Sequence, residues 1–226
     1  MATIRVKRGT TKPTTASLPY VGELAFDYTN NALYARNSTA VVKVGGELEK
    51  VYSYEGASSS HTVTYTFDPS YLYKIHIVAS TQGTLVDASA TYFNYRNASI
   101  TNLSGSYNAI YSNDASTTIT KISARNTTNF MVQDVHSSGT TLMSGITKVI
   151  DFELSPTFSA SLADTQQWVA YGKGITTVTG QADATITMVD FVHSMFGSIA
   201  YLFIYPGLNI GNPDLISVTI YRTLRK

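Results

Sequence analysis

Alternation of apolar and polar residues is the dominant pattern along this chain, and it predicts an all-β protein. In segment 61–67, for example, Val63, Tyr65 and Phe67 share one face of a strand, and threonines occupy the other face. Residues that alternate in this way suit strands with one buried and one exposed face. The clearest predicted strands are 61–67, 73–79, 88–95, 129–135, 148–154 and 216–223.

Turn residues separate these segments at intervals of roughly 8 to 15 residues, which is typical of an antiparallel β-sandwich with a jelly-roll-like arrangement. Gly172-Lys173-Gly174 is interpreted as one such turn. A short helix is expected over 163–171, because Asp164 is a suitable N-cap and a glycine follows Tyr171. Segment 188–196 fits both a strand and a helix, and we favour the strand.

Two domains are predicted, a small N-terminal β module at 1–50 and the β-sandwich at 51–226. The boundary lies at the charged run 47–50, which is followed by the small, polar segment 56–60. A chain of 226 residues is long enough to bury a core without disulfides, and it contains no cysteine.

The net charge of +1 and the charged fraction of 14% argue against nucleic-acid binding, which needs concentrated lysine and arginine. Basic residues gather near the two ends, as at Arg5, Lys7 and Arg8, where solvated termini and contact with an acidic neighbour both remain open. No apolar run is long enough for membrane insertion, and the polar start predicts no signal peptide.

Catalytic and metal-binding patterns are not found in the sequence, so we expect no enzyme, no metal and no cofactor. No two of the four histidines have a metal-ligand spacing. Asp151 and Glu153 are the only carboxylate pair considered for glycoside hydrolysis, and their predicted strand directs them away from the core. There is no Gly-x-Ser-x-Gly nucleophile motif. The histidines are His61, His76, His136 and His193.

The first 46 residues contain an ordered set of three short motifs: IRVKRGTT from Ile4, GELAFD from Gly22 and LYAR from Leu33. This set resembles the N-terminal module of many tail-fibre and other surface proteins of bacteriophages, particularly cyanophages and marine phages. The resemblance implies a module that attaches the chain to a virion or joins its copies. The implied attachment or oligomer-interface residues are Arg5, Lys7, Arg8, Glu23, Leu24, Phe26, Leu33 and Tyr34.

Tyrosine is unusually frequent, with 16 tyrosines against one tryptophan. Its ring offers apolar area with a polar tip, which suits glycan recognition and subunit interfaces alike. Two clusters lie in the predicted sandwich. The candidates for glycan or subunit contact are Tyr92, Tyr95, Tyr107 and Tyr111.

These observations predict a structural virion protein, best described as a trimeric short tail-fibre or spike subunit. The expected partners are other copies of the chain, further virion proteins and host surface polysaccharide, with no nucleic acid and no membrane insertion. The chain would be made in the host cytoplasm and reside on the virion. A capsid decoration protein and a carbohydrate-binding module are the alternatives.

Overall fold

The computed structural model describes residues 6–29, 32–44, 48–85, 91–113, 116–133, 143–157, 167–179, 185–207 and 215–224. The chain divides into two compact units, residues 1–49 and 50–226, one residue before the predicted boundary. The described residues form strands joined by turns and contain no helix. The all-β prediction is therefore confirmed.

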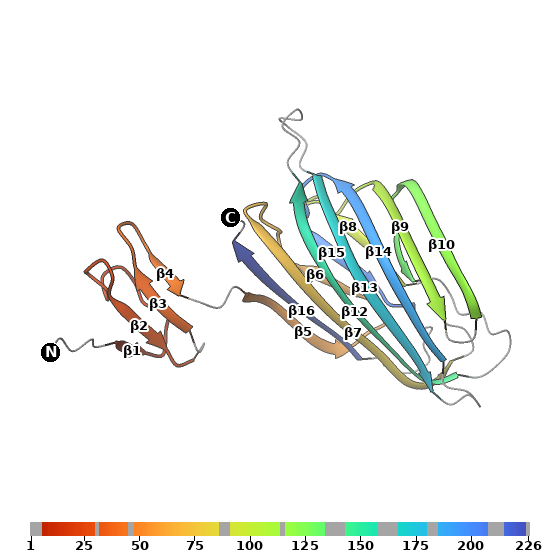
Figure 1. The fold of residues 1–226 in the computed structure, drawn as a ribbon, viewed down its shortest axis with the longest axis horizontal. Helices are drawn as coiled ribbons and strands as arrows, with labels where there is room; N and C mark the ends of the chain where they lie inside the picture. The colour runs from red at the N-terminus through yellow and green to blue at the C-terminus, as the bar shows by residue number, and fades with distance from the viewer. Residues whose placement is uncertain are drawn as a thin grey trace. The chain divides into compact units, whose positions relative to one another are not determined.

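The N-terminal unit is a four-stranded sheet in the order β1-β2-β3-β4 (Figure 1). Strand β1 runs parallel to β2, and the other two pairs are antiparallel. The edge strand β1 is therefore paired on one side only. The bounds are β1 (Lys7–Gly9), β2 (Leu24–Asp27), β3 (Ala32–Arg36) and β4 (Val41–Val44).

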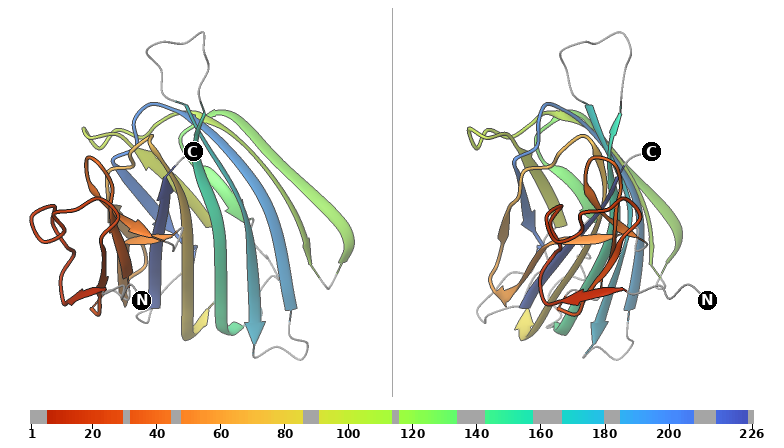
Figure 2. Two further views of the ribbon diagram at one scale, coloured as in Figure 1. Left: turned by 60° about the vertical axis from the view of Figure 1, so that its left-hand side comes forward. Right: turned by 90° about the vertical axis from the view of Figure 1, so that its left-hand side faces the viewer.

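The second unit is a sandwich of two sheets, which Figures 1 and 2 show as separate layers. One sheet has eight strands in the order β10-β9-β14-β13-β12-β7-β16-β5, and the other has four in the order β11-β8-β15-β6. The strands are β5 (Glu49–Ala57), β6 (His61–Thr64), β7 (Tyr71–Leu85), β8 (Thr91–Arg96), β9 (Gly105–Asn113), β10 (Ser116–Thr127), β11 (Phe130–Gln133), β12 (Met143–Thr157), β13 (Gln167–Thr179), β14 (Thr185–Phe196), β15 (Tyr201–Tyr205) and β16 (Leu215–Leu224).

The strand order contains a complete jelly roll. Without the hairpins β9–β10 and β13–β14, the sheets run β5-β16-β7-β12 and β6-β15-β8-β11, and the chain alternates between them as a jelly roll does. Both hairpins are added beyond β12, and they extend that sheet to eight strands. The jelly-roll-like arrangement is thus confirmed, with two insertions that enlarge one layer.

The core lies between the two layers and is rich in aromatic side chains. Phe93 of β8 stacks on Phe152 of β12 with ring centroids 5.3 Å apart, so the contact joins the facing sheets. Trp168 of β13 is fully buried near Phe67 and Tyr73. Burial of large rings is a main source of stability in such a core.

The predicted helix at 163–171 is wrong where the structure describes it, because 167–171 begin strand β13. Residues 163–166 lie outside the described residues. The predicted turn at 172–174 is also wrong, since these residues lie in the middle of β13. Gly172 and Gly174 occupy core-facing positions, where neighbouring side chains fill the space that their own would take. The favoured strand at 188–196 is confirmed as part of β14.

Candidate functional site

One face of the N-terminal sheet is apolar and half-exposed. Leu24 and Phe26 of β2 and Leu33 of β3 share this face, because alternate residues of a strand point the same way. The strand register places Phe26 beside Leu33 and Leu33 beside Val44 of β4. Val44 is 41% exposed and Val42 is exposed to the same degree. We call these five residues the N-terminal apolar face.

The opposite face of the same sheet is the core of the unit. Tyr34 is buried there with Ala25 and Leu18. Burial raises the pKa of the Tyr34 phenol, and the charge of Asp27 raises it further. This placement corrects the expectation that Tyr34 is an attachment residue, because its side chain packs inside the unit.

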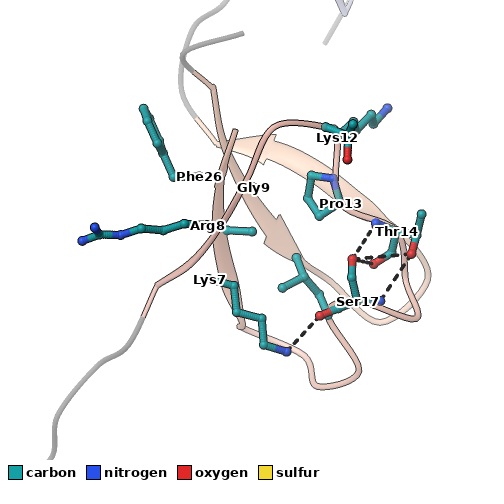
Figure 3. A pocket seen from close by; sticks show the side chains of 11 residues that line it. Lys7, Arg8, Gly9, Lys12, Pro13, Thr14, Ser17 and Phe26 are labelled. Atoms are coloured by element: carbon teal, nitrogen blue, oxygen red, sulfur yellow. Dashed lines mark hydrogen bonds between the residues drawn. The ribbon is translucent and has the colours of Figure 1, made fainter. Parts of the chain in front are cut away.

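A cavity of about 490 Å³ lies along the edge strand β1 (Figure 3). Lys7, Arg8 and Phe26 line it together with the segment 11–18. Figure 3 shows Lys7 turned toward Ser17 and Arg8 extending in another direction. The turn at Thr14, whose carbonyl accepts the Leu18 N–H at 3.1 Å, holds one wall of the cavity.

The charges around this cavity are only partly compensated. Lys7 Nζ lies 3.2 Å from Glu23 Oε1 and donates to the Ser17 carbonyl at 2.8 Å. The Tyr20 N–H donates to the Glu23 carboxylate and lowers its pKa, desolvation opposes this, and Lys7 lowers it further. Within the described part of the chain, Arg8 has no acidic partner. Arg8 therefore gives the rim of the N-terminal apolar face a positive charge. Arg5, the remaining basic residue of the first motif named as an attachment candidate, lies outside the described residues.

The tyrosine candidates of the sandwich do not form one surface. Tyr95 and Tyr107 are buried in the core, which corrects the expectation that they contact a glycan or a subunit. Tyr92 is half-buried, and its ring centroid lies 4.8 Å from that of Tyr205. Tyr111 belongs to β9, but its side chain lies outside what the structure describes.

In the core, the hydroxyl of Tyr95 is hydrogen-bonded to a buried histidine, His193. His193 Nε2 lies 3.2 Å from the Met131 carbonyl, and Nδ1 lies 3.0 Å from the Tyr95 hydroxyl. Because a carbonyl only accepts, Nε2–H donates to Met131 and Nδ1 accepts from Tyr95. Burial lowers the pKa of His193 to about 3, although the Met131 contact raises it slightly. The ring is therefore neutral at physiological pH and acts as a structural bridge.

Lys148 is a buried amine that the sequence did not single out. It shares the core-facing side of β12 with Ile150, and its Nζ donates to the Pro206 carbonyl at 2.7 Å and to Thr91 Oγ1 at 2.9 Å. Burial lowers the pKa of Lys148 to about 7. Thr91 belongs to β8 of the facing sheet, so the amine links the two layers. The sequence signal for burial of Lys148 is its spacing of two residues from Ile150, which puts both side chains on one face of the strand. A lysine at the first position of a predicted strand is instead interpreted as its exposed end.

The carboxylates considered for hydrolysis lie on the outer surface of the eight-stranded sheet. Asp151 Oδ1 lies 2.6 Å from His76 Nδ1, and Glu153 Oε1 lies 3.5 Å from Lys74 Nζ. All four side chains are largely exposed, as in ordinary cross-strand pairs. Among the described residues, no group of three histidine or acidic side chains is arranged to hold a metal ion.

Comparisons with protein-family models, with curated proteins and with solved structures find no match to the chain. In the part of the chain that the structure describes, no helix is long and apolar enough to cross a membrane.

Proposed function

We propose that this chain is a structural protein of a phage virion, a homotrimeric short tail-fibre or spike subunit. Its N-terminal unit attaches to the particle through the N-terminal apolar face. The sandwich is then presented to the host surface or to a neighbouring virion protein. The chain performs no catalysis in this role.

The observation that carries the proposal is the location of the motif residues. Leu24, Phe26 and Leu33, which the resemblance to phage attachment modules singles out, lie together on one half-exposed face of a separate small unit. Arg8 lies beside Phe26 in the strand register. All three motifs thus contribute to one surface. The first contributes Arg8, the second Leu24 and Phe26, and the third Leu33.

The N-terminal unit is too small to bury much of its apolar surface by itself. A domain of this size is marginally stable, because small domains bury a smaller fraction of their surface. An apolar face exposed to water forgoes stabilisation that its burial would give, and a partner that covers the face removes this apolar area from solvent. The uncompensated charge of Arg8 favours a partner whose surface is apolar with an acidic rim.

The proposal predicts that Val44→Glu lowers incorporation of the chain into phage particles at least tenfold. A charge buried within an apolar contact costs more than the roughly 1.4 kcal/mol that a factor of ten requires. Val44 is 41% exposed, so the unit does not need this side chain to fold. The measurement is an immunoblot of purified particles produced with wild-type or variant protein.

Val21→Glu is the matched control, because Val21 is an exposed apolar residue of the same unit outside the N-terminal apolar face. We expect it to be incorporated like wild type. Circular dichroism of each purified variant establishes that both are folded. Equal incorporation of Val44→Glu and wild type would refute attachment through this face.

A further inference from the structure

We infer that copies of this chain pack against one another through the outer face of the eight-stranded sheet. The inference rests on the proposed homotrimer and specifies the surface that would form it. That surface is the outer stripe, a set of exposed apolar side chains on three adjacent strands, β9, β13 and β14. It comprises Ile110, Tyr171, Ile175, Ile186, Met188 and Val192.

Strand register places the apolar side chains of the outer stripe on both sides of an outward-facing charged pair, Lys173 and Asp190. Ile175 of β13 lies beside Met188 of β14, and Tyr171 lies beside Val192. Asp190 is the β14 neighbour of Ile110 on β9. In Figure 1 the outer face of this sheet is turned toward the viewer, with β9, β14 and β13 side by side.

Strand β14 carries apolar side chains on both faces, with Asp190 between Met188 and Val192 on the outer face. Val189 and Phe191 point into the sandwich core and are buried, whereas Ile186, Met188 and Val192 point outward and are exposed. Strands with one solvated face usually alternate apolar and polar residues, and near-continuous apolar runs belong to strands buried on both sides. The three apolar side chains on the outer face of β14 depart from this alternation, which favours a partner that covers them.

The size of the outer stripe matches the centre of a protein interface. Its six side chains are each 40% to 56% exposed. Together they present on the order of 500 Å² of mainly apolar area, close to the apolar part of a standard interface of about 800 Å² per partner. A patch of this extent on a monomer commonly marks an interaction site.

The charges that cross the outer stripe favour a second copy of the same chain as the occupant. One row of the sheet reads His76, Asp151, Lys173 and Asp190 across four neighbouring strands. Lys173 Nζ lies 3.9 Å from Asp190 Oδ1, and the side chains of Asp151, Lys173 and Asp190 are largely exposed, whereas that of His76 is 44% exposed. Because Lys173 and Asp190 place opposite charges side by side, the ammonium of one copy can pair with the carboxylate of another copy. A strongly acidic partner would place like charge against Asp190, and a strongly basic partner would place like charge against Lys173.

Single-cysteine variants of the full chain test this inference directly, because the natural sequence contains no cysteine. Met188→Cys places a thiol in the outer stripe, and Leu224→Cys places one at a 65% exposed position outside it. Light scattering gives the oligomeric mass at each concentration, and a fluorescent maleimide gives the rate of thiol labelling.

We expect a trimer in which Met188→Cys is labelled at least tenfold more slowly than Leu224→Cys. Dilution that dissociates the trimer should abolish the difference. Met188→Glu should lower the mass to that of a monomer, whereas Leu224→Glu should leave the trimer intact.

The outcomes separate this inference from the proposed function. A trimer with equally fast labelling at both positions would refute the outer stripe as the interface but leave the proposed trimer standing. A dimer with a protected Met188→Cys would support the surface and contradict the trimer. A monomer with a protected thiol would show that another part of the same chain covers the stripe, and a monomer with a reactive thiol would refute both proposals.

Discussion

Gly172→Ala is expected to lower the free energy of unfolding of the sandwich by about 3 kcal/mol. Gly172 lies on the core-facing side of β13, and an added Cβ would overlap the Cβ of Phe152. It would also lie 2.6 Å from the Asp151 carbonyl oxygen and 2.6 Å from the Phe191 ring. A backbone oxygen and two packed aromatic side chains cannot all move away without loss of core contacts.

The single tryptophan of the chain makes this effect measurable in the sandwich alone, because Trp168 is fully buried there. Denaturant unfolding followed by its fluorescence gives the free energy for wild type and variant. Gly174→Ala on the same face of β13 is the comparison and should cost less, since an added Cβ there would meet one side-chain atom, Val189 Cγ1, at 2.7 Å and no other atom nearer than 3.6 Å. Wild-type stability of Gly172→Ala would show that β13 is not packed against Phe152 and Phe191.

Acidification from pH 6.5 to pH 4 is expected to cost the sandwich roughly 3 kcal/mol through His193 alone. Burial lowers the pKa of His193 to about 3 in the folded protein, against an ordinary value of 6.5. Between these two values the unfolded chain binds a proton that the folded chain does not. The contribution of His193 to the free energy of unfolding is therefore fully present above pH 6.5 and is lost as the pH falls toward 3.

His193→Gln should remove this contribution, because glutamine can donate to Met131 and accept from Tyr95 but does not titrate. The comparison is the slope of unfolding free energy against pH between 6.5 and 4, measured by denaturant unfolding. An unchanged slope in His193→Gln would contradict the buried, neutral histidine.

The sequence predicted strands best where one face is buried and the other is solvated. Ile216, Val218 and Ile220 are all buried in β16, and the polar residues between them face outward, as alternation predicted. Prediction failed at β13, where Gly172 and Gly174 take the core-facing positions and no apolar side chain marks the alternation. Glycine is required at position 172 because Phe152 and Phe191 on the neighbouring strands fill the space of a side chain. The local sequence does not show this, because both phenylalanines lie in other strands.

The candidate site was predictable as a set of residues but not as a surface. The motifs named Leu24, Phe26 and Leu33, and only the strand register showed that these share one face with Val42 and Val44. The two valines flank Lys43 in a short alternating segment, which was the available signal.

The outer stripe was hidden for a related reason. Apolar residues on both faces of β14 made segment 188–196 ambiguous between a strand and a helix. Tyr95 could not be placed in the core from sequence alone, because its partner His193 is distant along the chain.

The central claim, that this chain is a surface component of a phage tail, is tested most directly by immunogold labelling of intact particles. The particles are those of the phage that encodes the chain, and the antibody is raised against the purified full-length protein. Attachment as a tail fibre or spike predicts gold at the tail. Gold over the whole head would instead identify a capsid decoration protein, and particles without any gold would contradict the virion assignment itself.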